Sequence, residues 1–83
     1  MALLQYDAEI ARYEALVAAN DRTVAKYEAL CEELDKLSAQ GVSSLSDYLS
    51  AQEQLAAARL DGELYAMLRL QQQLLRTHYI SKL

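Results

Sequence analysis

The first half of the chain places apolar residues at alternating spacings of three and four, and this repeat limits the fold more than any other feature. The spacing is typical of a coiled-coil seam, where one face of a helix packs against another helix. The seam residues are Leu3, Tyr6, Ile10, Tyr13, Val17, Asn20, Val24, Tyr27, Cys31 and Leu34. Asn20 is the one polar member, and a polar seam residue usually fixes register or oligomeric state. The repeat predicts one long helix with a packing face.

Other residues of this helix widen the apolar face or lie behind it. Leu16, Leu30 and Leu37 extend the seam on one flank. The far side and its flank are rich in small residues, namely Ala8, Ala11, Ala15, Ala18, Ala25 and Ala29. Two interpretations are open: the alanines serve helix propensity alone, or they let further helices approach closely from outside.

The helical pattern is broken once, near the middle of the chain. The chain has no proline and only two glycines. Gly41 is suited to the position just past a helix C-terminus, where the backbone is left-handed. Ser44, followed three residues later by Asp47, reads as an acidic variant of a capping box that starts a second helix. Ser43 is the alternative cap.

The second half predicts another helix with a broader apolar face. Its large apolar residues are Leu45, Leu49, Leu60, Leu64, Met67, Leu68, Leu70, Leu74, Leu75 and Ile80, more than one seam can cover. Gly62 lies inside this helix, where glycine costs roughly 1 kcal/mol relative to alanine and marks either close packing or a tolerated defect.

A turn centred near residue 43 brings together residues whose numbers add up to about 86. We therefore expect Leu37 opposite Leu49, Cys31 opposite Leu55, Tyr6 opposite Ile80, and Tyr27 over the small residues of "AAAR" at 56–59. The predicted fold class is all-α, a long antiparallel two-helix coiled-coil hairpin. It forms a single unit over 1–83, with a helix over about 2–39, a turn over about 40–44 and a helix over about 45–82.

Length and charge exclude several classes of protein. Eighty-three residues allow one domain with a thin core. Together with the surplus leucines of the second helix, this predicts self-association through helix faces. The net charge of −4 and the lack of a basic, aromatic-studded stripe argue against nucleic acid. The chain begins without a secretory signal and contains no run of about 18 apolar residues, so we expect a soluble segment without membrane contact.

No combination of residues predicts chemistry. His78 has no partner at ligand spacing and reads as a surface residue, and Cys31 on the seam reads as a small buried apolar residue. Glu32, Glu33 and Asp35 read as a solvated acidic face. "LQQQLL" at 70–75 is either a polar stripe of a helical assembly or ordinary surface. We expect no catalytic residue, metal or cofactor, and therefore no enzyme.

The stretch "GVSSLSDYLSAQEQL" at 41–55 resembles the hairpin tip of the outer membrane efflux protein family, the TolC-type channels. That family has a glycine, a Ser or Thr, an Asp, an aliphatic residue, and an Ala-Gln pair followed by leucine. The matching residues are Gly41, Ser44, Asp47, Leu49, Ala51, Gln52 and Leu55. The flanking segments "KYEALCEELDKLSAQ" and "LAAARLDGELYAMLRLQQQLL" are similar to the family in their general residue pattern.

The resemblance implies a function in transport. Members form trimers with an outer-membrane β-barrel and a periplasmic α-helical duct built from such hairpins, and substrates pass through unchanged. The hairpin tips dock onto a periplasmic adaptor protein. The resemblance thus assigns partner binding to the tip residues Gly41, Val42, Ser43, Ser44, Leu45 and Asp47. It places the parent protein in the outer membrane and periplasm.

The chain lacks the family's signal sequence, strand segments and second repeat, so it resembles either an excised hairpin or a small stand-alone relative. Two further interpretations stay open. One is a generic or engineered coiled-coil hairpin that acts as a structural or interaction module. The other is the adaptor side of the same machine, whose tip pattern places an Arg before an Asp-Leu pair. Asp47-Tyr48 without that Arg fits this pattern poorly.

Overall fold

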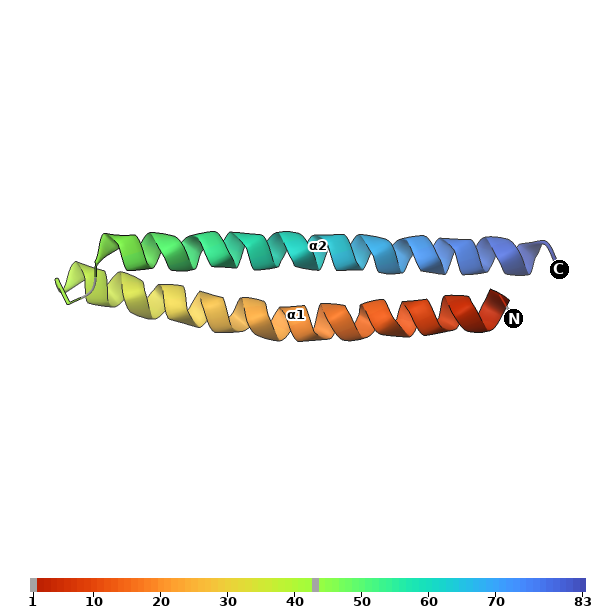
Figure 1. The fold of residues 1–83 in the computed structure, drawn as a ribbon, viewed down its shortest axis with the longest axis horizontal. Helices are drawn as coiled ribbons and strands as arrows, with labels where there is room; N and C mark the ends of the chain where they lie inside the picture. Colours follow the sequence, from red (N-terminus) through yellow and green to blue (C-terminus); the bar gives the residue numbers. More distant parts are fainter. Residues whose placement is uncertain (1, 43) are drawn as a thin grey trace.

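The computed structural model describes residues 2–42 and 44–83, which form two long antiparallel helices. Helix α1 spans Ala2–Ala39 and helix α2 spans Leu45–Ser81. They lie side by side along their whole length, with both termini at one end and the turn at the other (Figure 1). The Cα positions extend over 65 × 14 × 12 Å, which is one helix pair and no second layer. The predicted all-α helical hairpin is confirmed, and the described residues contain no strand.

Helix α1 packs as its repeat predicts. Every predicted seam residue is buried or half-buried, whereas the alanines behind the seam are exposed. Cys31 is 5% exposed and belongs to the best-buried cluster, together with Ala51 and Leu55 of α2. The predicted pairing of Cys31 with Leu55 and the predicted burial of the cysteine are therefore confirmed. Val24, Tyr27, Leu34 and Tyr48 pack around this cluster.

Helix α2 faces α1 with residues that its leucine pattern does not predict. The half-buried or buried positions follow the three-and-four spacing through Tyr48, Ala51, Leu55, Ala58, Gly62, Tyr65, Arg69, Gln72, Arg76 and Tyr79. The predicted pairing of Leu37 with Leu49 is wrong, because Leu49 is 56% exposed. Tyr6 packs against the ring of Tyr79, with centroids 6.0 Å apart, and not against Ile80.

The physical reason lies in the size of the facing side chains. The seam of α1 contains large tyrosines, and small residues on α2 such as Ala51, Ala58 and Gly62 leave room for neighbouring side chains. Arg69 and Arg76 cover the seam with long apolar stems. Arg76 reaches Asp7 at the edge, whereas the Arg69 Nε atom is buried without a hydrogen-bond partner among the described residues. The seam of α2 therefore holds small and amphipathic residues, and most leucines of α2 lie outside this seam.

Asn20 and Gly62 meet at the middle of the seam. Asn20 Nδ2 donates a hydrogen bond to the Ala58 carbonyl oxygen at 2.8 Å. A Cβ atom at position 62 would lie 2.6 Å from the same nitrogen. Gly62 thus marks close packing, because only a residue without a side chain lets the Asn20 amide reach the backbone of α2. This contact joins one particular residue of each helix and so fixes their register.

Two ion pairs cross between the helices on one edge of the hairpin. Arg59 contacts Glu28 at 3.4 Å, and Arg76 contacts Asp7 at 2.5 Å. Both acids belong to an acidic row that recurs every seventh residue of α1, at Asp7, Glu14, Asp21, Glu28 and Asp35. Because a seven-residue step returns to one side of the seam, all five carboxylates lie along this edge. The pairs are exposed, so each contributes little more than about 1 kcal/mol.

Neither helix, over the described residues, is both long enough and apolar enough to cross a membrane.

Candidate functional site

The tip begins with a tightly hydrogen-bonded end to α1. Gly41 has φ +74°, the left-handed conformation predicted for it. Its N–H donates to Ser38 O at 3.0 Å, and the Val42 N–H donates to Leu37 O at 2.8 Å. These two bonds form a Schellman motif, which satisfies carbonyls that the end of a helix leaves unpaired. The chain therefore leaves α1 in one defined direction.

The next helix begins with the predicted cap. Ser44 has extended backbone angles, φ −81° and ψ 151°, and its hydroxyl accepts a hydrogen bond from the Asp47 N–H at 3.1 Å. Asp47 lies in the first turn of α2, where a negative charge is stabilised by the helix dipole. Ser44 is thus the cap, and the alternative, Ser43, lies outside the described residues. Both sides of the turn are held by specific bonds.

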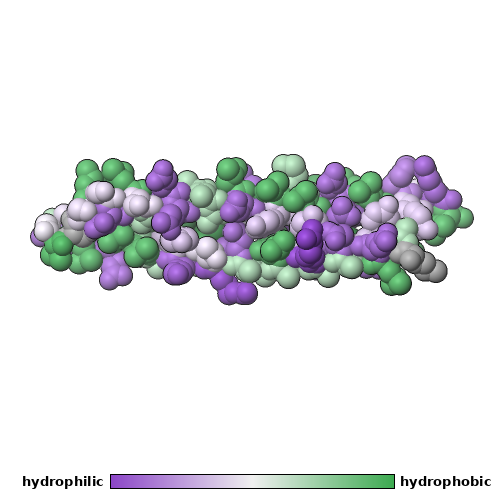
Figure 2. All heavy atoms as spheres, in the orientation of Figure 1, coloured by the Kyte–Doolittle hydropathy of each residue, from purple (hydrophilic) through white to green (hydrophobic). Residues whose placement is uncertain are grey.

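The tip exposes its apolar side chains. Val42 is 70% exposed and Leu45 is 63% exposed, although both are anchored next to capped helix ends. Apolar side chains are visible around this end of the molecule in Figure 2. Of the predicted tip residues, the structure brings Gly41, Val42, Ser44, Leu45 and Asp47 together at one end of the hairpin. Exposed apolar side chains beside two capped helix ends are suited to contact with another protein.

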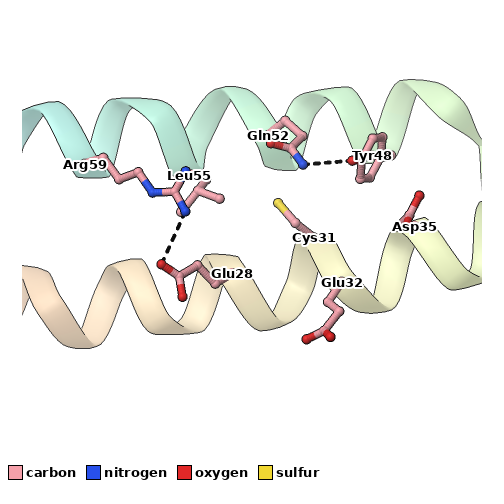
Figure 3. Close-up of a pocket in the computed structure, with 8 residues that line it drawn as sticks. All are labelled: Glu28, Cys31, Glu32, Asp35, Tyr48, Gln52, Leu55 and Arg59. Carbon is pink, nitrogen blue, oxygen red and sulfur yellow. Dashed lines mark hydrogen bonds and ion pairs between the residues drawn. The ribbon is translucent and has the colours of Figure 1, made fainter.

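A shallow groove lies between the helices beside the buried cluster (Figure 3). Its walls carry Glu28, Glu32 and Asp35 of α1 and Tyr48, Gln52 and Arg59 of α2, with Cys31 and Leu55 at its base. Gln52 Nε2 donates to Tyr48 Oη at 2.9 Å. Arg59 contacts Glu28 across the groove at 3.4 Å, and no group of three potential metal ligands is found among the described residues.

The second notable surface is the outer face of α2. The outer stripe of α2, as we call it, consists of Leu60, Met67, Leu70 and Leu74, each more than half exposed. These residues point away from α1 because they are out of phase with the seam. Apolar side chains are visible along the outer edge of α2 in Figure 2. The predicted surplus of apolar surface on the second helix is therefore present as an exposed stripe on its outer face.

Helix α1 carries a matching surface of small residues. The outer stripe of α1 consists of Ala8, Ala11, Ala15, Ala18, Ala25 and Ala29, all of them exposed. A paler apolar colour marks the outer edge of α1 in Figure 2. Arg22 interrupts this stripe, as Glu63 interrupts that of α2. The hairpin thus has a large-residue face on one outer edge and a small-residue face on the other.

The charged residues of α1 lie both beside the seam and on the outer side. Its basic residues, Arg12, Arg22, Lys26 and Lys36, lie on the outer side, and the acidic row lies beside the seam. The pKa of the Arg12 guanidinium is raised, chiefly because it donates a hydrogen bond to Tyr13 Oη at 3.0 Å and also because Glu9 lies beside it. Glu32 and Glu33 are exposed on the outer side as well, so this side of α1 carries charges of both signs.

The sequence analysis did not predict the seam of α2, nor the arginines of α2 that contact acidic residues of α1. The signal was present, since the acidic row repeats every seventh residue next to the α1 seam. In an antiparallel pair, such a row faces the corresponding row of the other helix, which contains Arg59. Most leucines of α2 share a different face, which is more apolar than the seam but exposed.

Comparison of the chain with protein-family models, with curated proteins and with solved structures gives no match.

Proposed function

We propose that this chain is the periplasmic hairpin of a TolC-type outer-membrane efflux channel. Its tip docks onto a periplasmic adaptor protein, and its helices help to form the export duct. The observation that carries the proposal is the tip, where Val42 and Leu45 are exposed on a turn that is capped on both sides. The sequence of this turn is also the part of the chain that resembles the family. The chain itself catalyses nothing in this function.

The bonds at the tip give physical support to docking. A turn offers a partner few groups, so two exposed apolar side chains supply most of the favourable contact. Gly41 and Ser44 fix the backbone on either side of these side chains, which reduces the conformational entropy lost on binding. Gly41, Ser44 and Asp47, three of the residues that carry the resemblance, are also the residues that shape the turn.

Site-specific photo-cross-linking in cells that express the chain natively tests the proposal. A photoreactive phenylalanine at position 42 should capture a periplasmic adaptor, identified by mass spectrometry. The same group at Lys26, which is exposed on α1 far from the tip, serves as the matched control. Capture of an adaptor at both positions, or at neither, would contradict docking through the tip.

A second variant separates docking from folding. Replacing Val42 and Leu45 together by serine should abolish adaptor capture through a probe placed at Gln40, while helicity by circular dichroism stays unchanged. Both residues are exposed, so the hairpin loses little packing. Unchanged capture in this variant would leave the turn as a connection only.

The alternative is a self-associating structural module, and the outer stripe of α2 is the observation that favours it. In that case the Val42 and Leu45 double variant keeps all its interactions, whereas polar substitutions at Met67 and Leu74 remove them. The two functions thus predict opposite sensitivities at opposite ends of the hairpin.

A further inference from the structure

We propose that the outer face of α2 binds the same face of a second copy of this chain, with the two hairpins antiparallel and their tips pointing in opposite directions. The two α2 helices lie at the centre of this pair, and the two α1 helices lie outside. All tips of a duct point one way, so the pair is a different assembly. It does not depend on adaptor binding at the tip.

The half of the hairpin nearer the termini has exposed apolar side chains and no buried residue of its own. Among the described residues, the buried ones all lie in the half nearer the tip: Cys31, Ala51, Leu55 and Ala58. The outer stripe of α2 begins where this cluster ends, at Leu60, and continues to Leu74. A partner on this face therefore covers apolar surface at the level where the hairpin itself covers least.

The outer face of α2 has the spacing of a further coiled-coil seam. Exposed residues follow one another at alternating steps of three and four, and we call them the second seam: Ala57, Leu60, Leu64, Met67, Gln71 and Leu74. Such a spacing keeps one face of a helix turned toward a partner helix over several turns. Helix α2 thus has one seam that packs on α1 and a second seam that faces away from α1.

The second seam matches itself in an antiparallel pair when the numbers of facing residues add up to 131. Leu64 of each copy then lies opposite Met67 of the other, and Ala57 lies opposite Leu74. The two-fold axis passes between residues 65 and 66, so each of these apolar contacts occurs twice. The contact is centred away from the tip and leaves it exposed in both copies.

The charges on this face favour the antiparallel arrangement. In the same register, Glu53 of one copy lies level with His78 of the other. Asp47 lies near Lys82 of the other copy in the same way. These four side chains are exposed, and none has an ion-pair partner among the residues that the structure describes. A parallel pair would instead place each acid level with its own copy, so that like charges face each other.

Cysteine cross-linking tests the direction of the two hairpins in the whole chain, with Cys31→Ala as the background. Ser50→Cys and Ser81→Cys lie on the outer face of α2 at positions that add up to 131, and both serines are exposed. The two variants are oxidised separately and as a mixture. The mixture should give disulfide-linked dimers, whereas each variant alone should give few, because identical positions lie about 46 Å apart in the antiparallel pair.

Efficient dimers from either variant alone would show that the tips point the same way and would overturn the proposal. Absence of cross-links in all three samples would overturn it as well. Circular dichroism of each variant confirms that the chain is helical under the conditions of oxidation.

Charge exchange gives an independent test. Glu53→Lys and His78→Glu should each weaken dimerisation measured by sedimentation by about fivefold or more, because each change places like charges level with each other twice in the dimer. The Glu53→Lys/His78→Glu double variant should recover most of the loss. Glu33→Lys is the matched control, since it changes the net charge as Glu53→Lys does but lies on α1, outside the contact.

Three results would overturn the proposal: losses that add up in the double variant, an equal loss in Glu33→Lys, or a wild-type chain that sediments as a monomer. Each can occur whether or not the tip binds an adaptor, which the photo-cross-linking at position 42 measures separately.

Discussion

Gly62→Ala should have opposite effects on stability depending on the residue at position 20. In the wild-type chain the new Cβ atom would lie 2.6 Å from Asn20 Nδ2, so the amide must move and lose its 2.8 Å hydrogen bond to Ala58 O. A half-buried amide left unpaired costs about 1–3 kcal/mol. Alanine gains about 1 kcal/mol over glycine in helix propensity. The net effect is a loss of about 0–2 kcal/mol.

In an Asn20→Ala background the obstacle is absent, and Gly62→Ala should stabilise the hairpin by about 1 kcal/mol. The coupling free energy between the two positions is then about 1–3 kcal/mol. Urea unfolding followed by circular dichroism, at one fixed protein concentration, measures all four variants. Ala57→Gly, at an exposed position of the same helix, calibrates the propensity difference without a contact. Equal effects of Gly62→Ala in both backgrounds would refute the idea that this glycine serves the Asn20 contact.

Three further changes test the tip and the ion pairs. Gly41→Val should lower the free energy of unfolding by about 1–2 kcal/mol, because a β-branched residue resists a φ of +74°. Gly41→Asn should lower it less, since asparagine tolerates the left-handed conformation better. Equal losses for the two variants in urea unfolding would contradict this explanation by backbone strain. Ser44→Ala removes the bond to the Asp47 N–H and should lower the free energy of unfolding by about 1 kcal/mol in the same assay. A loss below a few tenths of a kcal/mol would contradict the role of Ser44 as the cap. Arg76→Gln breaks the exposed pair with Asp7 and should cost less than about 1 kcal/mol, an effect that shrinks in high salt; a larger, salt-independent loss would mean that the arginine acts by packing.

The parts of the fold that local rules determine were predictable from the sequence. The heptad pattern of α1, the left-handed Gly41 and the Ser44 cap each depend on residues close together in the chain, so their spacing alone indicates the structure. The exposure of the tip residues Val42 and Leu45 also follows from their position in a short turn.

The seam of α2 could not be read from hydrophobicity. Its inward face is chosen by what α1 presents: Tyr27 packs against the cluster that contains Ala51, and the Asn20 amide reaches the backbone of α2 beside Gly62. The most apolar face of α2 therefore points outward, as Met67 and Leu74 show. Periodicity identifies which residues share a face, but the partner decides which face is buried.

The acidic row beside the seam of α1 has a consequence for the electric field around the hairpin. Among the described residues, Arg76 and Arg59 neutralise Asp7 and Glu28 of this row, whereas Glu14, Asp21 and Asp35 have no ion-pair partner. This edge of the molecule therefore keeps a negative potential that attracts cations, and dissolved salt weakens that attraction.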